Sequence, residues 1–256
     1  TDVDDTPPTI TNITSSTANG IFTTGDEISI QVTLSESVTV VGNPILTLET
    51  GSSDTNATYS SGSGSDTLTF NYTVLSTDNN CDLDYSSTSS LSVSGSSSIK
   101  DSAGNNATLT LPSPGATGSL GANKALVVDN TAPSISVQNV TVNVGSGEVT
   151  LSASDFDNGT SDACDSSLTY QITSGTFNCS DVGTTQSGLI RVTDDAGNYS
   201  EAVYTVTVVD TTAPVITLVE SNTVEIERLA TYTDAGATAT DTCDGTMTSS
   251  IVTTSN

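Results

Sequence analysis

DNTAPSIS, at residues 129–136, decides the fold of this chain because it marks where one β-rich repeat ends and the next begins. The motif recurs as DDTPPTIT at residues 4–11 and as DTTAPVIT at residues 210–217. Each copy has an acidic residue, then a proline that lacks a backbone N–H, then an apolar alternation that opens a new strand. A hinge repeated in this way predicts a string of β-modules.

The hinges predict three domains, at residues 1–129, 130–210 and 211–256. No stretch of ten or more residues has the apolar period of a helix, so the predicted fold is all-β, with tandem antiparallel β-sandwiches arranged as an elongated rod. The third domain is shorter than the roughly 100 residues usual for a sandwich. We expect either that the chain continues beyond residue 256 or that a neighbouring molecule supplies the missing strands by β-augmentation.

Apolar and polar residues alternate in short runs, the pattern of half-buried strands. Clusters of Gly, Ser, Asn and Asp separate the runs and predict turns. The alternating positions are Ile28, Ile30, Val32, Leu34, Leu46, Leu48, Leu68, Phe70, Tyr72, Val74, Leu109, Leu111, Leu126 and Val128 in the first domain, Val140, Val142, Val144, Val149, Leu151, Leu168, Tyr170, Ile172, Tyr204, Val206 and Val208 in the second, and Ile216, Leu218, Val224 and Ile226 in the third.

The charge is strongly one-sided. Thirty acidic residues against four basic ones give a net charge of −26. Such a chain is repelled by nucleic acid, so we expect no nucleic-acid partner. The longest apolar stretches are strand-sized, so we expect no membrane insertion. An acidic excess is typical of a surface adapted to a saline medium or of a set of divalent-cation sites, and the sequence leaves both explanations open.

Four cysteines allow three disulfide connectivities, which the sequence leaves open. Cys164 and Cys179 lie 15 residues apart within the second domain, a spacing at which a bridge contributes about 3 kcal/mol on the loop-entropy model. This favours a Cys164–Cys179 bridge and leaves Cys81 and Cys243 for an inter-module or intermolecular role. Few lysines and placed cysteines are typical of an exported protein.

Motifs in the first domain resemble the long repeats of giant bacterial surface proteins, including a cyanobacterial swimming-motility type. They are TSSTANG at residues 14–20, KDSAGN at residues 100–105 and GSLGANK at residues 118–124. The resemblance implies a secreted or surface-anchored, adhesin-like or filament-forming protein.

The second and third domains resemble other Ig-like types. NGTSDAC at residues 158–164 and VTDDAGN at residues 192–198 are similar to a hyalin-repeat (HYR) domain, in which the cysteines matching Cys164 and Cys179 are expected to be bonded. APVITL at residues 213–218 is similar to the first half of another bacterial Ig-like domain. The resemblance implies that the predicted sandwiches are Ig-like.

Asp-x-Ala-Gly-Asn occurs twice, at residues 101–105 and 194–198, each time ahead of a hinge aspartate. Calcium takes six to eight oxygen ligands from carboxylates, amides and carbonyls. We therefore expect calcium sites at the module junctions that stiffen the rod, although Asp, Gly and Asn are also preferred in turns for backbone reasons alone. The expected ligands are Asp101, Asn105, Asp129, Asp194, Asn198 and Asp210.

The chain has no histidine, which removes the usual triads and zinc sites. A carboxylate pair could hydrolyse glycosides, but the chain has no tryptophan to hold a sugar. We expect no catalytic residues.

The sequence therefore favours an extracellular structural or adhesive protein, an Ig-like stalk or filament subunit on a bacterial surface. Expected partners are neighbouring copies or further Ig-like domains of the same chain, and a cell-surface or carbohydrate ligand. The alternative is a spacer or a set of carbohydrate-binding modules in a larger secreted enzyme.

Overall fold

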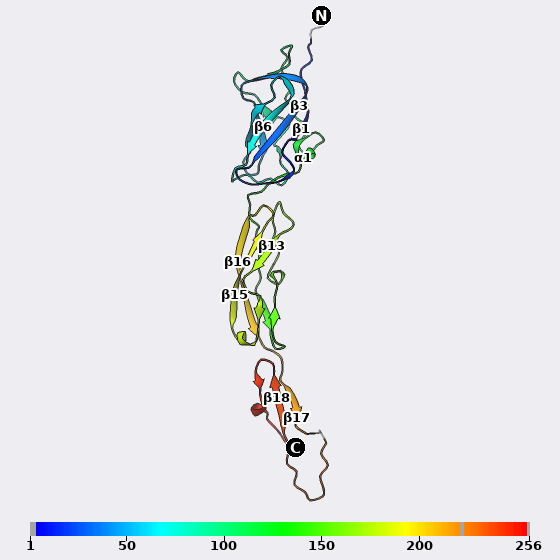
Figure 1. Ribbon diagram of the computed structural model, residues 1–256, viewed down its shortest axis with the longest axis vertical. Coiled ribbons are helices and arrows are strands. Elements are labelled where there is room, and N and C mark those ends of the chain that lie inside the picture. Colours follow the sequence, from blue (N-terminus) through cyan, green and yellow to red (C-terminus); the bar gives the residue numbers. More distant parts are fainter. Residues whose placement is uncertain (1–3, 221–222, 255–256) are drawn as a thin grey trace. The chain divides into compact units, whose positions relative to one another are not determined.

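The computed structural model describes residues 4–220 and 223–254, and these are predominantly β-strand (Figure 1). The chain divides into two compact units. Unit 1 contains residues up to Pro133 together with two later segments, Ser161–Leu168 and Thr193–Asn198. Unit 2 contains Ser134–Thr160, Thr169–Val192 and the residues from Tyr199 onward. The β-rich character expected from the alternation is confirmed, while the three domain boundaries stay a prediction.

Unit 1 is built on one eight-stranded sheet with the path β1-β3-β6-β5-β4-β7, to which β8 is added beside β4 and β9 beside β3. A short parallel pair, β2 and β10, and one helical turn, α1, complete the unit. The elements are β1 Ile10–Ser15, β2 Gly20–Phe22, β3 Glu27–Val41, β4 Ile45–Glu49, β5 Thr55–Ser61, β6 Ser65–Thr73, β7 Asp84–Tyr85, β8 Leu91–Ser92, β9 Ser98–Lys100, α1 Leu120–Asn123 and β10 Leu126–Val128.

The long strand β3 organises the core of unit 1. Every second residue from Ile28 to Leu34 is buried, as a period-two pattern requires when one face of a sheet is covered. β3 pairs with β1 on one side and with β6 on the other. The buried core consists of Ile13, Ile28, Ile30, Val32, Leu34, Val38, Leu46, Leu48, Ala57, Leu68, Phe70, Tyr72, Val74, Leu83, Tyr85, Leu91, Ile99, Leu111, Leu120, Leu126 and Val128.

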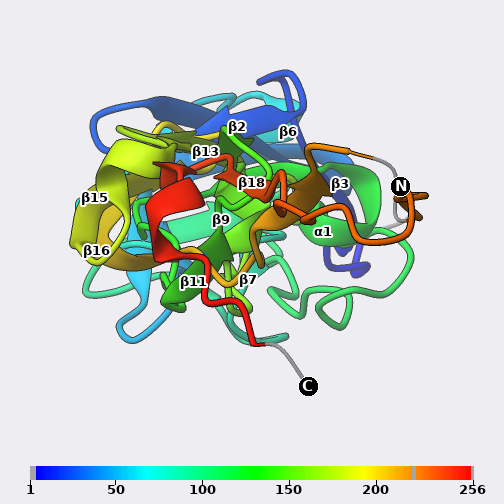
Figure 2. The same ribbon diagram turned by 90° about the horizontal axis from the view of Figure 1, so that it is seen from below.

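Unit 2 has a four-stranded sheet with the order β11-β16-β15-β13 and a two-stranded sheet of β12 and β14. A third sheet has the order β17-β18-β19. Figures 1 and 2 both show β15 and β16 side by side. The elements are β11 Val140–Asn143, β12 Val149–Thr150, η1 Ala153–Asp155, β13 Thr169–Ile172, β14 Thr176–Phe177, η2 Cys179–Asp181, β15 Thr185–Thr193, β16 Tyr199–Val209, β17 Val215–Leu218, β18 Ala237–Asp241, β19 Gly245–Thr246 and η3 Thr248–Ser250.

An aromatic pair holds the centre of unit 2. The rings of Phe156 and Tyr204 are stacked with centroids 3.8 Å apart, and both side chains are almost fully buried. The Tyr204 hydroxyl donates to the carbonyl of Ser174, so the polar end of the ring is satisfied inside the core. This contact joins β16 to the loop that leads into β14.

Two predicted strands did not form. Leu109 and Leu111 lie in irregular chain, because the prolines at residues 112 and 114 cannot donate to a ladder. Leu111 is nevertheless buried in the core of unit 1. Val224 and Ile226 are also outside strands and are exposed, with no partner strand among the described residues.

We predict that Phe156→Ala lowers the free energy of unfolding of unit 2 by about 3–5 kcal/mol, because it empties a buried aromatic site and removes the stacked ring. Urea unfolding followed by circular dichroism measures the change. Val203→Ala on β16 is the matched control, since Val203 is 64% exposed and its loss should cost less than about 0.5 kcal/mol. Equal effects of the two substitutions would contradict the assignment of the core.

Candidate functional site

Each hinge aspartate forms the same local turn. The side chain of Asp129 accepts a hydrogen bond from the N–H of Thr131, two residues later, at 3.0 Å. Asp4 does the same with Thr6, and Asp210 with Thr212. Asp favours this turn because its short side chain reaches the backbone two residues on. The three hinges thus present their carboxylates in one local geometry.

Each Asp-x-Ala-Gly-Asn motif forms a closed turn around its aspartate. Asp101 Oδ1 accepts the N–H of Asn105 at 2.8 Å, and Asp101 Oδ2 accepts Asn105 Nδ2 at 2.7 Å. Asp194 and Asn198 repeat both bonds, at 2.8 Å and 3.0 Å. The glycine has a φ of +90° in the second copy, a conformation that other residues avoid.

These turns meet the hinge that precedes their own repeat. Asn105 Nδ2 donates to the carbonyl of Asp4 at 2.8 Å, and Asn198 Nδ2 donates to the carbonyl of Asp129 at 3.3 Å. The sequence prediction had joined each turn to the following hinge. The second turn, residues 194–198, connects β15 to β16. This hairpin places the turn at the end where its own repeat begins, and the turn therefore meets Asp129.

The first acidic cluster contains Asp4, Glu36 and Asp101, whose carboxylate oxygens lie within 4.8 Å of one another. Burial, followed by repulsion from Asp4 and Asp101, raises the pKa of Glu36. Hydrogen bonds from Asn105 and from backbone N–H groups outweigh burial and lower the pKa of Asp101. Glu36 was missed by the sequence prediction, because β3 carries it and no turn motif marks it.

The second acidic cluster contains Asp129, Asp162, Asp165 and Asp194, all in unit 1. Asp129 and Asp194 are only 2% and 6% exposed. Burial raises the pKa of Asp129, the Thr131 N–H opposes this, and the carboxylates of Asp162, Asp194 and Asp165 raise it further. The carboxylates of this second cluster thus act on one another through their charge, and two of them have little access to water, but they are not among the groups whose oxygens lie within 4.8 Å of one another.

A short loop motif positions two members of this cluster. Asp162 Oδ1 accepts the N–H groups of Cys164 and Asp165, at 2.8 Å and 3.1 Å. Asp165 Oδ2 accepts the N–H of Asp195, which lies in the Asp-x-Ala-Gly-Asn turn, at 2.6 Å. The loop and the turn are therefore locked to each other beside Asp129.

The same Asp-x-Cys-Asp motif builds the third acidic cluster, in unit 2. Asp241 Oδ1 accepts the N–H groups of Cys243 and Asp244, at 2.8 Å and 3.0 Å. The Asp244 and Cys243 N–H groups lower the pKa of Asp241. Carboxylate oxygens of Asp210, Asp241 and Asp244 lie within 4.8 Å of one another. The predicted ligand Asp210 thus lies with two aspartates that the sequence prediction missed.

Neighbouring residues fix the position of two hinges. In unit 1, Asn130 Nδ2 donates to the carbonyl of Asp78 at 2.8 Å, while Asn130 Oδ1 accepts the N–H of Thr24 at 2.8 Å. In unit 2, Gly145 leaves room for the hinge, because a Cβ there would overlap Asp210 Oδ1 and Thr212 Oγ1. The carboxylates are therefore held in place by the surrounding backbone.

The cysteines are paired differently from the expectation. The structure contains Cys81–Cys164 and Cys179–Cys243 bridges, with Cα–Cα distances of 4.8 Å and 4.9 Å. The predicted Cys164–Cys179 bridge was wrong, because Cys164 lies in unit 1 and Cys179 lies in unit 2. Cys81 and Cys243 were expected to have an inter-module or intermolecular role, and each is bonded to a cysteine of the predicted second domain.

A repeat in the sequence could have indicated this pairing. Cys164 and Cys243 both occupy the third position of Asp-x-Cys-Asp, while Cys81 and Cys179 both follow an asparagine. Equivalent cysteines take equivalent partners if each Asp-x-Cys-Asp loop is bonded to the preceding cysteine. The bridges close loops of 83 and 64 residues, each stabilising the fold by about 4–5 kcal/mol on the loop-entropy model.

Positive charge is scarce around these sites. Among residues 4–220 and 223–254, the one ion pair joins Arg191 to Glu201, at 2.7 Å. The described part of the chain therefore supplies no ion-pair partner to the three acidic clusters. In that same part, no helix has the length and apolar character needed to span a membrane.

Comparison with known proteins does not identify a family. No protein-family model and no curated protein matches the chain. It is similar to a structure described as "Crystal structure of Drosophila N-cadherin EC1-4", with 15% identity over 84% of this chain and 54% of that chain and a TM-score of 0.25. It is also similar to "Crystal structure of dimeric latent PorU from Porphyromonas gingivalis", with 12% identity over 82% of this chain and 25% of that chain and a TM-score of 0.17. The chain thus spans about half of the first structure's length and a quarter of the second's.

We predict that peptide mapping without reductant, after pepsin digestion at acidic pH, finds Cys81–Cys164 and Cys179–Cys243. Removing either bridge by a double substitution, Cys81→Ser with Cys164→Ser or Cys179→Ser with Cys243→Ser, should lower the free energy of unfolding by about 4 kcal/mol. The two double variants serve as controls for each other, since each leaves the other loop closed. A peptide joining Cys164 to Cys179 would contradict the assignment.

Proposed function

We propose that this chain is part of an extracellular structural protein, built of tandem Ig-like β-sandwiches and acting as a stalk or filament subunit whose junctions are stiffened by calcium. The observation that carries the proposal is the convergence of a hinge aspartate with two further carboxylates, at Asp4 and again at Asp210. A catalytic site has no reason to be built repeatedly from the same hinge, whereas a structural junction has.

The donor set of the second cluster suits a hard divalent cation. Asp129, Asp162, Asp165 and Asp194 offer carboxylate oxygens, and calcium accepts such ligands in flexible geometry. Burial, and after it repulsion from Asp162, Asp194 and Asp165, raises the pKa of Asp129, and a bound cation would offset both. The first and third clusters are the two in which three carboxylate oxygens lie within 4.8 Å of one another, the spacing at which they could share one ion.

The disulfides support an extracellular location, because such bonds persist in oxidising compartments. A stalk that works outside the cell also gains from a covalent link near each hinge. Cys164 and Cys243 each lie between two aspartates of an acidic cluster, so a bridge and a proposed metal site occupy the same loop.

Adhesion and self-association are the activities we assign to this stalk, with neighbouring copies, further Ig-like domains or a cell-surface carbohydrate as partners. The bacterial surface-protein motifs of the first domain and the hyalin-repeat motifs of the second support this assignment. We propose no enzymatic activity, because the chain lacks histidine and its cysteines are bonded in pairs.

We predict that calcium raises the melting temperature of the metal-free chain. At a concentration 100 times the dissociation constant, a site that exists only in the folded state adds about 2.7 kcal/mol, which corresponds to roughly 5–10 °C for a chain of this size. Differential scanning calorimetry with and without chelator measures the shift. Asp129→Asn and Asp194→Asn should reduce it, while Asp54→Asn, at an exposed site outside the clusters, should leave it unchanged. An equal melting temperature with and without calcium would overturn the metal role.

We predict that Asp129→Asn stabilises the chain when metal is removed. The raised pKa means that the folded state holds this proton more tightly than the unfolded state, so the contribution of Asp129 becomes unfavourable as the pH rises above the usual Asp range. The free energy of unfolding is measured in chelator from pH 3 to pH 8. Relative to the native chain, the variant should become more stable as the pH rises. A variant that loses stability relative to the native chain over that range would contradict the assigned repulsion.

A further inference from the structure

Asparagine followed by glycine occurs twice in this chain, at Asn19–Gly20 and at Asn158–Gly159. This pair of residues is chemically special, because the main-chain nitrogen of the second residue can attack the side-chain carboxamide of the first. Glycine favours the attack, since it has no Cβ to obstruct the nitrogen and its backbone adopts many conformations. The chain thus contains two places where a spontaneous covalent change is chemically open, and the structure holds them differently.

Hydrogen bonds hold both halves of the first pair. Gly20 begins β2, which pairs in parallel with β10, and its N–H donates to the carbonyl of Ala125 at 3.1 Å. The carboxamide Oδ1 of Asn19 accepts the N–H of Ala125 at 3.2 Å. The attacking nitrogen and the group that it would attack are therefore both tied to Ala125. Bringing them together requires these bonds to break.

Neither constraint acts on the second pair. Asn158 and Gly159 are exposed residues in a bend, and Gly159 has a φ of +87°. The main-chain N–H of Asn158 donates to the carbonyl of Ser136 at 2.9 Å. The carboxamide of Asn158, in contrast, has no hydrogen-bond partner in the part of the chain that the structure describes. The side chain can therefore change rotamer without breaking a bond.

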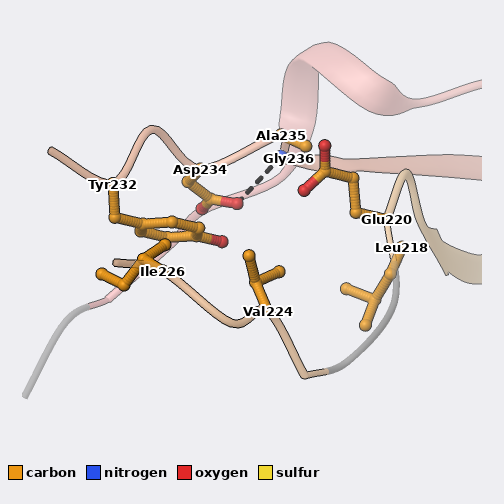
Figure 3. Close-up of a pocket in the computed structure, with 8 residues that line it drawn as sticks. All are labelled: Leu218, Glu220, Val224, Ile226, Tyr232, Asp234, Ala235 and Gly236. Atoms are coloured by element: carbon orange, nitrogen blue, oxygen red, sulfur yellow. Dashed lines mark hydrogen bonds between the residues drawn. The ribbon is translucent and has the colours of Figure 1, made fainter. Parts of the chain in front are cut away.

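Asp and Asn side chains at other turns of this protein are engaged with the backbone. Figure 3 shows this at Asp234, whose Oδ1 accepts the N–H of Gly236, two residues later, at 2.9 Å. Asn178 Oδ1 accepts the N–H of Ser180 in the same way, also at 2.9 Å. Such a bond holds the side-chain carbonyl group toward the residue two positions on. Asn158 lacks it.

The neighbouring carboxylate of Asp157 explains why Asn158 forms no such turn. Asp157 Oδ1 accepts the N–H of Thr160 at 3.0 Å, and this is the N–H that Asn158 would otherwise bind. Hydrogen bonds from Thr160 outweigh burial and lower the pKa of Asp157, and the N–H groups of Gly159 and Asn158 contribute to the lowering. An ionised carboxylate thus lies beside the Gly159 N–H, which must lose its proton in the attack.

We propose that Asn158 is a site of spontaneous deamidation through a cyclic imide, whereas Asn19 is protected by the fold. The Gly159 nitrogen loses its proton and bonds to Asn158 Cγ, while the Cγ–Nδ2 bond breaks and Nδ2 leaves, with that proton, as ammonia. Water then opens the ring. Cleavage of the imide at Cγ leaves aspartate, and cleavage at the main-chain carbonyl leaves isoaspartate, in which the main chain runs through the former side chain.

The modification would act on the loop near the start of the second repeat. Each event replaces a neutral amide with a carboxylate next to Asp157, in a chain whose net charge is already −26. Isoaspartate also adds one methylene to the main chain ahead of Thr160. The Thr160 hydroxyl accepts the N–H of Ser136 and donates to its carbonyl, both at 3.1 Å, and we expect these bonds to loosen. The proposal does not depend on calcium, since Asn158 belongs to none of the acidic clusters.

The test incubates the full folded chain in warm, mildly alkaline buffer. Samples are digested with pepsin at acidic pH, and mass spectrometry with fragmentation that distinguishes isoaspartate from aspartate follows residues 19 and 158. We expect Asn158 to be converted about tenfold or more faster than Asn19, because the bonds that hold Asn19 must open first. The matched control is the same chain, reduced and unfolded in denaturant, in which both pairs should react at comparable rates.

A variant links the modification to its structural effect. Asn158→Gln keeps a carboxamide but would have to form a larger ring, so we expect it to stay unmodified under the same incubation. Amide hydrogen exchange of Ser136 should become faster in the incubated native chain and stay unchanged in the incubated variant.

Three outcomes would overturn the proposal. One is conversion of Asn158 in the folded chain that is no faster than that of Asn19. Another is aspartate without isoaspartate at residue 158, because direct hydrolysis of the carboxamide forms no cyclic imide. The third is a rate difference that persists in the unfolded chain, since the neighbouring residues and not the fold would then select Asn158.

Discussion

The turn that fixes each hinge aspartate beside other acidic residues is the constraint on which the rest of the structure depends. Asp129 is nearly buried, and its burial, followed by the charges of Asp162, Asp194 and Asp165, raises its pKa. Such a group stays in place only because the surrounding backbone holds it. N–H donors serve Asp129, Asp162 and Asp165, and the Asp-x-Ala-Gly-Asn turn closes around Asp194. The loops that gather negative charge are thus held in place by backbone hydrogen bonds.

The disulfides belong to the same construction. Each Asp-x-Cys-Asp loop contributes both of its aspartates to a cluster and its cysteine to a bridge, so the loop that concentrates charge is also fixed covalently. Loop closure over 83 and 64 residues restricts the unfolded chain and offsets part of the cost of burying carboxylates. Among the described residues no ion pair reaches the acidic clusters, so the covalent links are the stabilising contacts that the structure shows at these loops.

Several parts of this arrangement were accessible from the sequence because they are local. Alternation in Ile28 to Leu34 predicted a strand, and these residues lie in β3. The turn motifs indicated two of the loops in which the aspartates of the first and second clusters lie, while the metal-ligand role of Asn105 and Asn198 stays a prediction. The strand predicted at Leu109 and Leu111 did not form, because alternation does not reveal that neighbouring prolines prevent pairing. Glu36 escaped notice because a strand residue reaches Asp4 and Asp101 only through folding.

The sequence by itself determined the β-rich character, the repeat and the acidic loops, since period-two burial, proline and Asx turns act over a few residues. Only the tertiary structure decided which turn meets which hinge and which cysteines are bonded. Spacing along the chain favoured Cys164 with Cys179, yet Cys164 bonds to Cys81, which is 83 residues away. The physical reason is that strand pairing fixes which chain ends return to one another, and this depends on contacts between residues that are far apart in sequence.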